Sequence, residues 1–94
     1  MKTLNVGDWV WPRGNSRPGP ISEIDNELVD VLAILGDGVA TTMYRMSFWS
    51  NQVRPLTADE LTYWRPKIAA ILNGAGVDLE PQVRALFFGS VVVA

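Results

Sequence analysis

Cysteine and histidine are both missing from this chain of 94 residues. Without cysteine there are no disulfides, thiolate metal sites or cysteine nucleophiles. Without histidine, zinc, copper and haem lose their usual ligand, and only Asp, Glu, Lys and Tyr remain for proton transfer. We therefore expect a protein that is not an enzyme and that carries neither a metal nor a cofactor.

An excess of positive charge is also absent. Eight Lys and Arg residues stand against ten Asp and Glu residues, a formal net charge of −2, whereas nucleic-acid-binding domains usually show a clear positive excess. No apolar run approaches the ~18 residues of a membrane-spanning helix, and the opening Met1–Asn5 lacks the apolar stretch of a signal peptide. The sequence predicts a cytoplasmic protein with no membrane partner.

The composition is that of a folded domain, because apolar residues make up 48% of the chain and charged residues 19%. A chain of this length has room for a single core. The amino-acid composition changes near Thr57, from a segment rich in Gly, Pro, Thr, Val and Trp to one rich in residues that favour helices. We expect a β-rich part over residues 1–57 and a helical extension over 58–94, packed together as one compact unit.

Short strands separated by turn signals are expected in the first part. The first strand is expected to end at Pro12, and the other four are expected at 21–25, 28–35, 39–46 and 53–56. Residues 13–20 are expected to form a loop rich in Gly and Pro. The segment Ser47–Gln52 is expected to be a short connection. One alternative stays open, since apolar residues between Ile24 and Leu35 also fall on one helical face. A helix at 22–35 would make the fold α+β.

Two helices are expected in the second part. Thr57-Ala58-Asp59-Glu60 matches a capping box, and an apolar stripe follows until the stop signal Asn73-Gly74. Pro66 interrupts this stripe, so it either kinks one helix or opens a second one. Glu80-Pro81 then resembles another helix start, with its apolar side extending toward Gly89.

The order of these segments resembles a Src-homology-3-type small barrel, and Tudor and KOW domains look similar. The resemblance rests on Gly7-Asp8-Trp9-Val10, the Gly/Pro-rich loop, Gly19-Pro20-Ile21, and Val53-Arg54-Pro55-Leu56, and it covers about residues 5–57. It implies a mainly β fold, a five-stranded Src-homology-3-like barrel with a C-terminal helical extension. Such barrels host many functions, so the fold alone does not choose among them.

Aromatic residues are the first candidates for a binding surface. In Src-homology-3 domains an aromatic shelf grips proline-rich peptides, and in Tudor domains an aromatic cage holds a methylated cation. The residues that could line such a groove here are Trp9, Trp11, Tyr44, Phe48 and Trp49. Alternation places Trp9 and Trp11 on one face, where both could equally belong to the core. Phe48-Trp49, between two serines, is the stronger surface candidate.

Arginines are the second candidates. Arg13 and Arg17 on the long loop, with Arg45 and Arg54 on later strands, could converge on phosphates as in KOW-like domains. Neighbouring acids could instead pair with them. The sequence therefore favours a module that binds a protein partner through an aromatic groove, with Arg13, Arg17 and Arg45 supplying charge. A nucleic-acid-binding accessory protein that uses these arginines is the alternative.

The chain ends in an unusually apolar stretch. Ala85-Leu86-Phe87-Phe88 and Val91-Val92-Val93 offer more apolar surface than a small core absorbs. We expect either a helix that packs over one end of the barrel or an added strand that closes a sheet edge. The added strand could close an edge of its own barrel or of a second copy, and in the second case residues 83–94 would form a homodimer.

Overall fold

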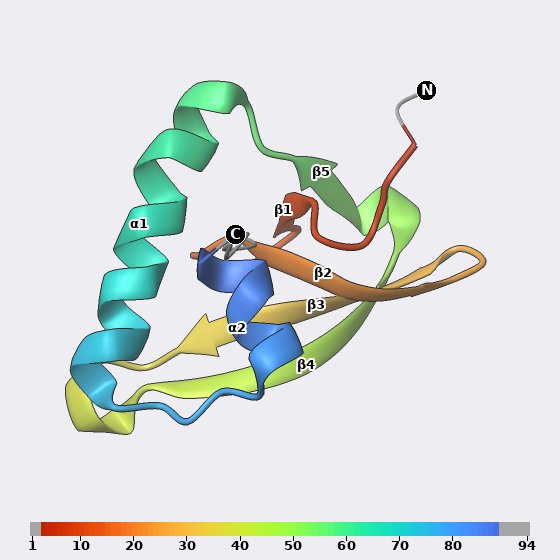
Figure 1. The fold of residues 1–94 in the computed structure, drawn as a ribbon. Coiled ribbons are helices and arrows are strands. Elements are labelled where there is room, and N and C mark those ends of the chain that lie inside the picture. The colour runs from red at the N-terminus through yellow and green to blue at the C-terminus, as the bar shows by residue number, and fades with distance from the viewer. Residues whose placement is uncertain (1–2, 89–94) are drawn as a thin grey trace, which may run out of the picture.

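The computed structural model describes residues 3–88, which form an antiparallel sheet and two helices (Figure 1). The strands are β1 (Trp9–Pro12), β2 (Gly19–Asp25), β3 (Leu28–Leu35), β4 (Thr42–Trp49) and β5 (Val53–Pro55). Two 3₁₀ turns, η1 (Gly38–Ala40) and η2 (Ser50–Gln52), flank β4. The helices are α1 (Ala58–Ala75) and α2 (Pro81–Phe88).

The sheet has the strand order β4-β3-β2-β1-β5, and every neighbouring pair is antiparallel. A tight turn joins β2 to β3, with Asn26 at a φ of 54°. The alternative of a helix at 22–35 is therefore wrong, because this segment pairs along both of its sides as strands. Within residues 3–88 the end strands β4 and β5 do not pair with each other, so the sheet is open and its closure into a barrel is not shown.

The fold is less dominated by strands than expected, since helices cover about as much of the described chain as strands do. The expected strand at 39–46 is also displaced. Residues 38–40 form η1, and β4 continues to Trp49 because it pairs with β3 without interruption from Leu35↔Thr42 to Leu28↔Trp49. Phe48 and Trp49 consequently belong to a strand and not to a connection.

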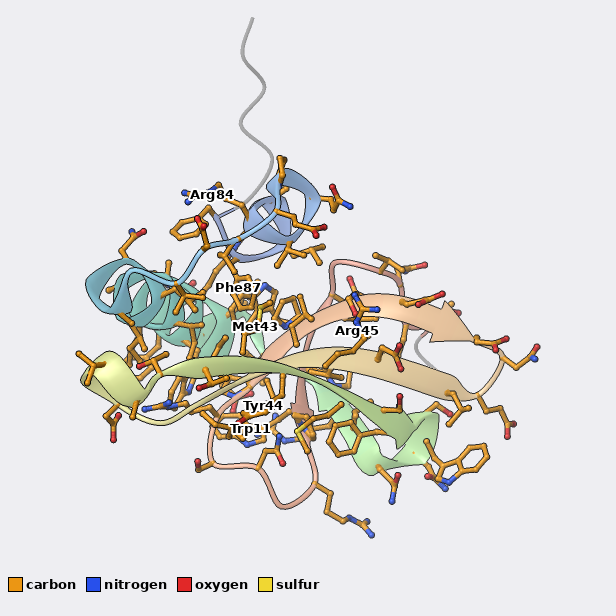
Figure 2. The ribbon with its side chains drawn as sticks, turned by 90° about the horizontal axis from the view of Figure 1, so that it is seen from below. Trp11, Met43, Tyr44, Arg45, Arg84 and Phe87 are labelled. Carbon is orange, nitrogen blue, oxygen red and sulfur yellow. The ribbon has the colours of Figure 1, made fainter. Side chains whose placement is uncertain are left out.

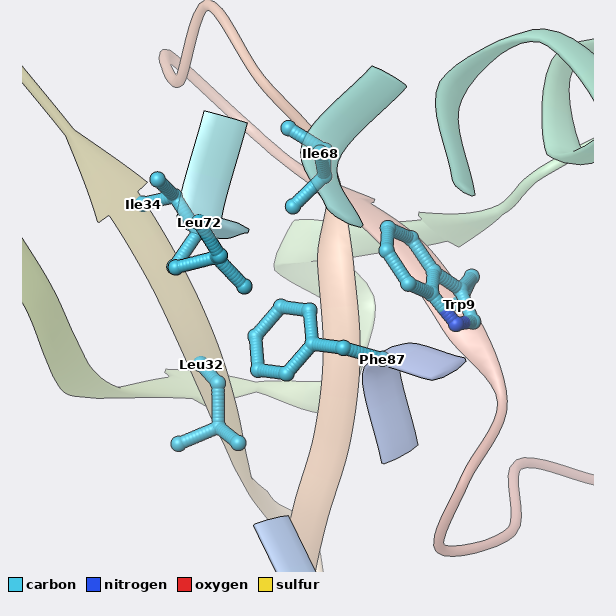
Figure 3. Packing of buried hydrophobic residues seen from close by; sticks show 6 residues of the cluster. All are labelled: Trp9, Leu32, Ile34, Ile68, Leu72 and Phe87. Carbon is cyan, nitrogen blue, oxygen red and sulfur yellow. The ribbon is translucent and has the colours of Figure 1, made fainter. Parts of the chain in front are cut away.

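Alternation along the strands divides the apolar side chains between two faces of the sheet. The face toward the helices carries one buried cluster, formed by Trp9, Leu32, Ile34, Ile68, Leu72 and Phe87 (Figure 3). The opposite face carries a second cluster, formed by Val10, Ile21, Val29 and Val31. Both helices thus contribute to the first core, which the sheet alone would leave exposed to water.

The capping box predicted at the start of α1 is present. Thr57 Oγ1 accepts from the Glu60 N–H at 3.2 Å, and Glu60 Oε1 accepts from the Thr57 N–H at 3.0 Å. The helix runs through the exposed Pro66 as one element. It ends at Ala75 and not at Asn73-Gly74, because Gly76 adopts the left-handed backbone, with a φ of 67°, that closes the helix.

The helix predicted from Pro81 is confirmed as α2. The expected Val91–Val93 strand lies outside the described residues, as does the C-terminal part of the 83–94 segment assigned to a dimer contact. Among residues 3–88 no helix is both long and apolar enough to cross a membrane.

Candidate functional site

A groove of about 390 Å³ opens between the loop that follows β1 and the turn η2. Its two walls are tied together, because the Arg13 N–H donates to the Gln52 carbonyl at 2.7 Å. The loop is tied to its own strand by the Trp11 indole N–H, which donates to the Asn15 carbonyl at 2.7 Å. The lining residues are Trp11, Pro12, Arg13, Gly14, Asn15, Asn51, Gln52, Val53 and Arg54.

Trp11 joins the groove to the helical layer. Its ring stands edge-on to that of Trp64 in α1, with centroids 5.3 Å apart and planes at 84°. The Arg54 guanidinium lies 5.3 Å from the centroid of the Trp11 ring, within cation–π range. The Trp11 side chain is thereby held by contacts with its own loop, with β5 and with α1, which fixes the shape of the groove.

Arg54 itself is oriented by a carboxylate. Its two terminal nitrogens meet Glu60 Oε1 at 2.8 Å and Oε2 at 2.9 Å. The hydrogen bond from Arg54, followed by that from the Thr57 backbone, lowers the pKa of Glu60 from 4.5 to about 2. The pKa of Arg54 is raised in turn by Glu60. The Arg54–Glu60 ion pair therefore connects the groove, which Arg54 lines, to the capping box of α1, which contains Glu60.

The aromatic contacts continue along α1. Tyr63 and Trp64 meet edge-on at 5.4 Å, and Lys67 Nζ lies 5.0 Å from the Tyr63 ring and 4.9 Å from the Trp64 ring. Trp64 lies on the apolar stripe that the sequence predicts for this helix, and that pattern does not by itself connect Trp64 to the groove. The available signal was the spacing of Tyr63 and Lys67, which places them on neighbouring turns of one helix face.

Of the residues that the sequence predicts for a binding surface, Trp11, Arg13 and Arg54 line the groove. Trp9 is only 6% exposed and belongs to the first core cluster, so in the described fold it is not available to a binding surface. Arg17 is also engaged within the chain, donating to the Gly36 carbonyl at 2.8 Å and to Asp37 Oδ1 at 2.7 Å. It fastens the loop to the end of β3.

The remaining predicted residues lie on β4 and do not line the groove. Phe48 packs against the second core, whereas Trp49 is 54% exposed and Tyr44 50% exposed. Arg45 is exposed and, as Figure 2 shows, lies with Met43 on the side of β4 that faces Phe87, opposite to Tyr44. The structure thus places the predicted residues in the groove, in the two core clusters, in the loop contact made by Arg17 and on the exposed parts of β4.

Three carboxylates also gather away from the groove. Glu23, Asp25 and Asp30 surround a hollow of about 150 Å³ together with Leu28. Among residues 3–88 no group of three metal-binding side chains has the geometry of a metal site. We therefore do not treat this hollow as part of the candidate site.

No protein-family model matches the sequence, and no curated protein matches it significantly. The five-stranded antiparallel sheet with two helices is compatible with a small-barrel fold, and this coarser description is the one that the structure supports.

Proposed function

We propose that this protein is a non-catalytic interaction module that holds an extended segment of a protein partner in the groove between residues 13–15 and 51–54. The observation that carries the proposal is the groove itself, whose walls are tied together by the Arg13–Gln52 hydrogen bond. A groove that is held open before binding loses little conformational entropy when a partner enters it. We also propose that the fold is related to Src-homology-3-type small barrels.

The chemistry of the lining supports binding over catalysis. The side-chain amides of Asn15 and Asn51 and the side-chain NH2 group of Gln52 offer hydrogen bonds to a partner's backbone, and Trp11 offers an aromatic surface. Arg13 is exposed, and no hydrogen bond or ion pair of its side chain is formed within the described residues. A carboxylate on the partner fits this position, since guanidinium groups bind carboxylates in a two-pronged geometry.

The test is affinity capture from a nuclease-treated native lysate with three baits. They are the intact chain, Arg13→Glu in the groove, and Arg84→Glu on α2 as a control with the same change of charge. We expect a protein that the intact chain and Arg84→Glu retain and that Arg13→Glu loses. Amide resonances of residues 13–15 and 51–53 should then shift when the purified partner is added.

Nucleic-acid binding is the competing outcome. It would show as recovery that nuclease abolishes and as an affinity that falls steeply with salt, because phosphate contacts release counterions. Groove binding through Trp11 and the amides predicts a shallow dependence on salt. Retention that is the same with all three baits would overturn the assignment of the groove.

A further inference from the structure

The outer edge of β4 is a feature of the fold that the groove does not use. The strand has eight residues, contains no proline or bulge, and pairs with β3 along its full length. It is the last strand of the open sheet, and within residues 3–88 no backbone hydrogen bond reaches its other side. Unprotected edges of this length tend to pair with another strand.

The hydrogen-bond pattern identifies which residues face that edge. The Ser50 N–H donates to the Glu27 carbonyl, so this pair is a hydrogen-bonded pair of the β3–β4 ladder. Bonded and non-bonded pairs alternate in an antiparallel ladder, and the register is constant as far as Thr42. The backbone groups of Met43, Arg45 and Ser47 therefore point outward. Trp49 follows the same pattern, and its N–H is already bound by Gln52 Oε1 at 2.9 Å.

We propose that β4 pairs antiparallel with β4 of a second copy of this chain, about a two-fold axis at Met46. In this register Arg45 lies opposite Ser47 of the second copy and exchanges two backbone hydrogen bonds with it, as outward-facing residues of an antiparallel pair do. Dimers with two-fold symmetry are the commonest assemblies of identical chains. The proposal is independent of the function proposed for the groove.

Charge complementarity supports this occupant. Glu23, Asp30 and Ser47 form one lateral row across β2, β3 and β4, and the Ser47 hydroxyl donates to Asp30. Arg45 lies diagonal to Asp30 in its own chain, and no ion pair joins them in the described residues. In the two-fold pairing, Arg45 of the second copy lies opposite Ser47 and so extends the row that contains Glu23 and Asp30. The symmetry places the same charge arrangement at a second, equivalent position in the dimer.

The same charges select the register. With the axis at Arg45, two arginines would lie directly opposite each other, which destabilises a strand pair. With the axis at Met46, Tyr44 instead faces Phe48 of the second copy, and Met43 faces Trp49. Tyr44 and Trp49 are among the large apolar side chains that the single chain leaves half exposed. Pairing at Met46 covers both of them.

The first test measures the mass of the full chain in solution by sedimentation. We expect a dimer, and we expect Arg45→Glu to weaken its association about tenfold or more, because the new carboxylate faces the row of acids. Combining Arg45→Glu with Asp30→Lys should restore association. Arg84→Glu serves as the control for net charge, and thermal unfolding confirms that each variant folds.

The second test uses the absence of cysteine from the native chain. In the proposed register the two copies of residue 46 form a non-bonded pair on the axis, at a spacing that a disulfide spans. Met46→Cys should therefore form a disulfide-linked dimer under mild oxidation, and Tyr44→Cys should do so far less readily. A crosslink favoured at residue 45 would overturn the register.

Three further outcomes would overturn the proposal. The first is a chain that stays monomeric at every concentration tested. The second is a dimer that neither responds to Arg45→Glu nor crosslinks through Met46→Cys, which would place the contact elsewhere, for instance in residues 83–94. The third is a monomer whose β4 amides become protected from hydrogen exchange only when a different protein is added.

Discussion

The ring of Phe87 in α2 stands edge-on to that of Trp9 in β1, with centroids 5.8 Å apart and planes at 89°. The Trp9 indole N–H also donates to the Leu86 carbonyl at 3.3 Å. Two residues from opposite ends of the described chain thus meet in the core, where Phe87 is fully buried. The last helix is therefore part of the core and not an appendage to the sheet.

Truncating Phe87 should remove much of the stability of the fold. We expect Phe87→Ala to lower the free energy of unfolding by ~3–5 kcal/mol, since burial is lost and a cavity opens beside Trp9. Val39→Ala is the control, because Val39 is fully exposed, and its change should stay within ~0.5 kcal/mol. Urea unfolding followed by tryptophan fluorescence measures both. Equal effects of the two substitutions would contradict the placement of α2.

Acid should destabilise the protein through Glu60. The pKa of Glu60 is lowered from 4.5 to about 2 in the folded chain, so its ionised form stabilises the fold fully above the unfolded value. This contribution disappears as the pH falls from 4.5 toward 2. We expect the free energy of unfolding to decrease over this window and Glu60→Gln to flatten the decrease.

The matched control for the acid effect is Asp59→Asn, at the neighbouring position in the first turn of α1. It removes one carboxylate but leaves the Arg54–Glu60 pair in place, so the decrease that belongs to Glu60 should persist. Chemical unfolding at a series of pH values provides the comparison. The same pH profile for the intact chain and Glu60→Gln would show that the ion pair does not contribute.

Two glycines should respond in opposite directions to alanine. A Cβ at Gly19 would lie 2.2 Å from the Leu32 carbonyl oxygen, so β2 and β3 would have to separate. Gly74 lies within α1 with no atom near its would-be Cβ, and alanine there should add ~0.5–1 kcal/mol of stability. We expect thermal unfolding to show a lower midpoint for Gly19→Ala and a higher one for Gly74→Ala. A raised midpoint for Gly19→Ala would contradict the close approach.

Arg17 should act on stability and not on binding. Its guanidinium bonds the Gly36 carbonyl and the Asp37 carboxylate together, which a lysine ammonium does not reproduce. We expect Arg17→Lys to lower the free energy of unfolding by ~1–3 kcal/mol, because charge-assisted hydrogen bonds are lost. Arg13→Lys, on the exposed part of the same loop, should change it by less than ~0.5 kcal/mol. Partner capture that fails with Arg17→Lys while stability is unchanged would argue for a binding role.

Local signals in the sequence predicted most, but not all, of the elements of this fold. The capping box at Thr57–Glu60, the turn at Asn26-Glu27 and the proline that opens α2 each act through backbone groups a few residues away, so spacing alone predicts them. The β-rich first part and the helical second part follow from the same local preferences. The absence of cysteine and histidine likewise limits the available chemistry, whatever fold the chain adopts.

Only the tertiary structure decided which aromatic and charged side chains remain available. Trp9 and Trp11 are equivalent by alternation, yet Phe87 buries the first, while Trp64 supports the second at a groove. Arg13 and Arg17 share a loop, yet only Arg17 reaches the end of β3. These outcomes depend on contacts between residues far apart in the chain, which no local pattern encodes. The pairing of β3 with β4 likewise determined that Phe48 packs inward and that one strand edge stays open.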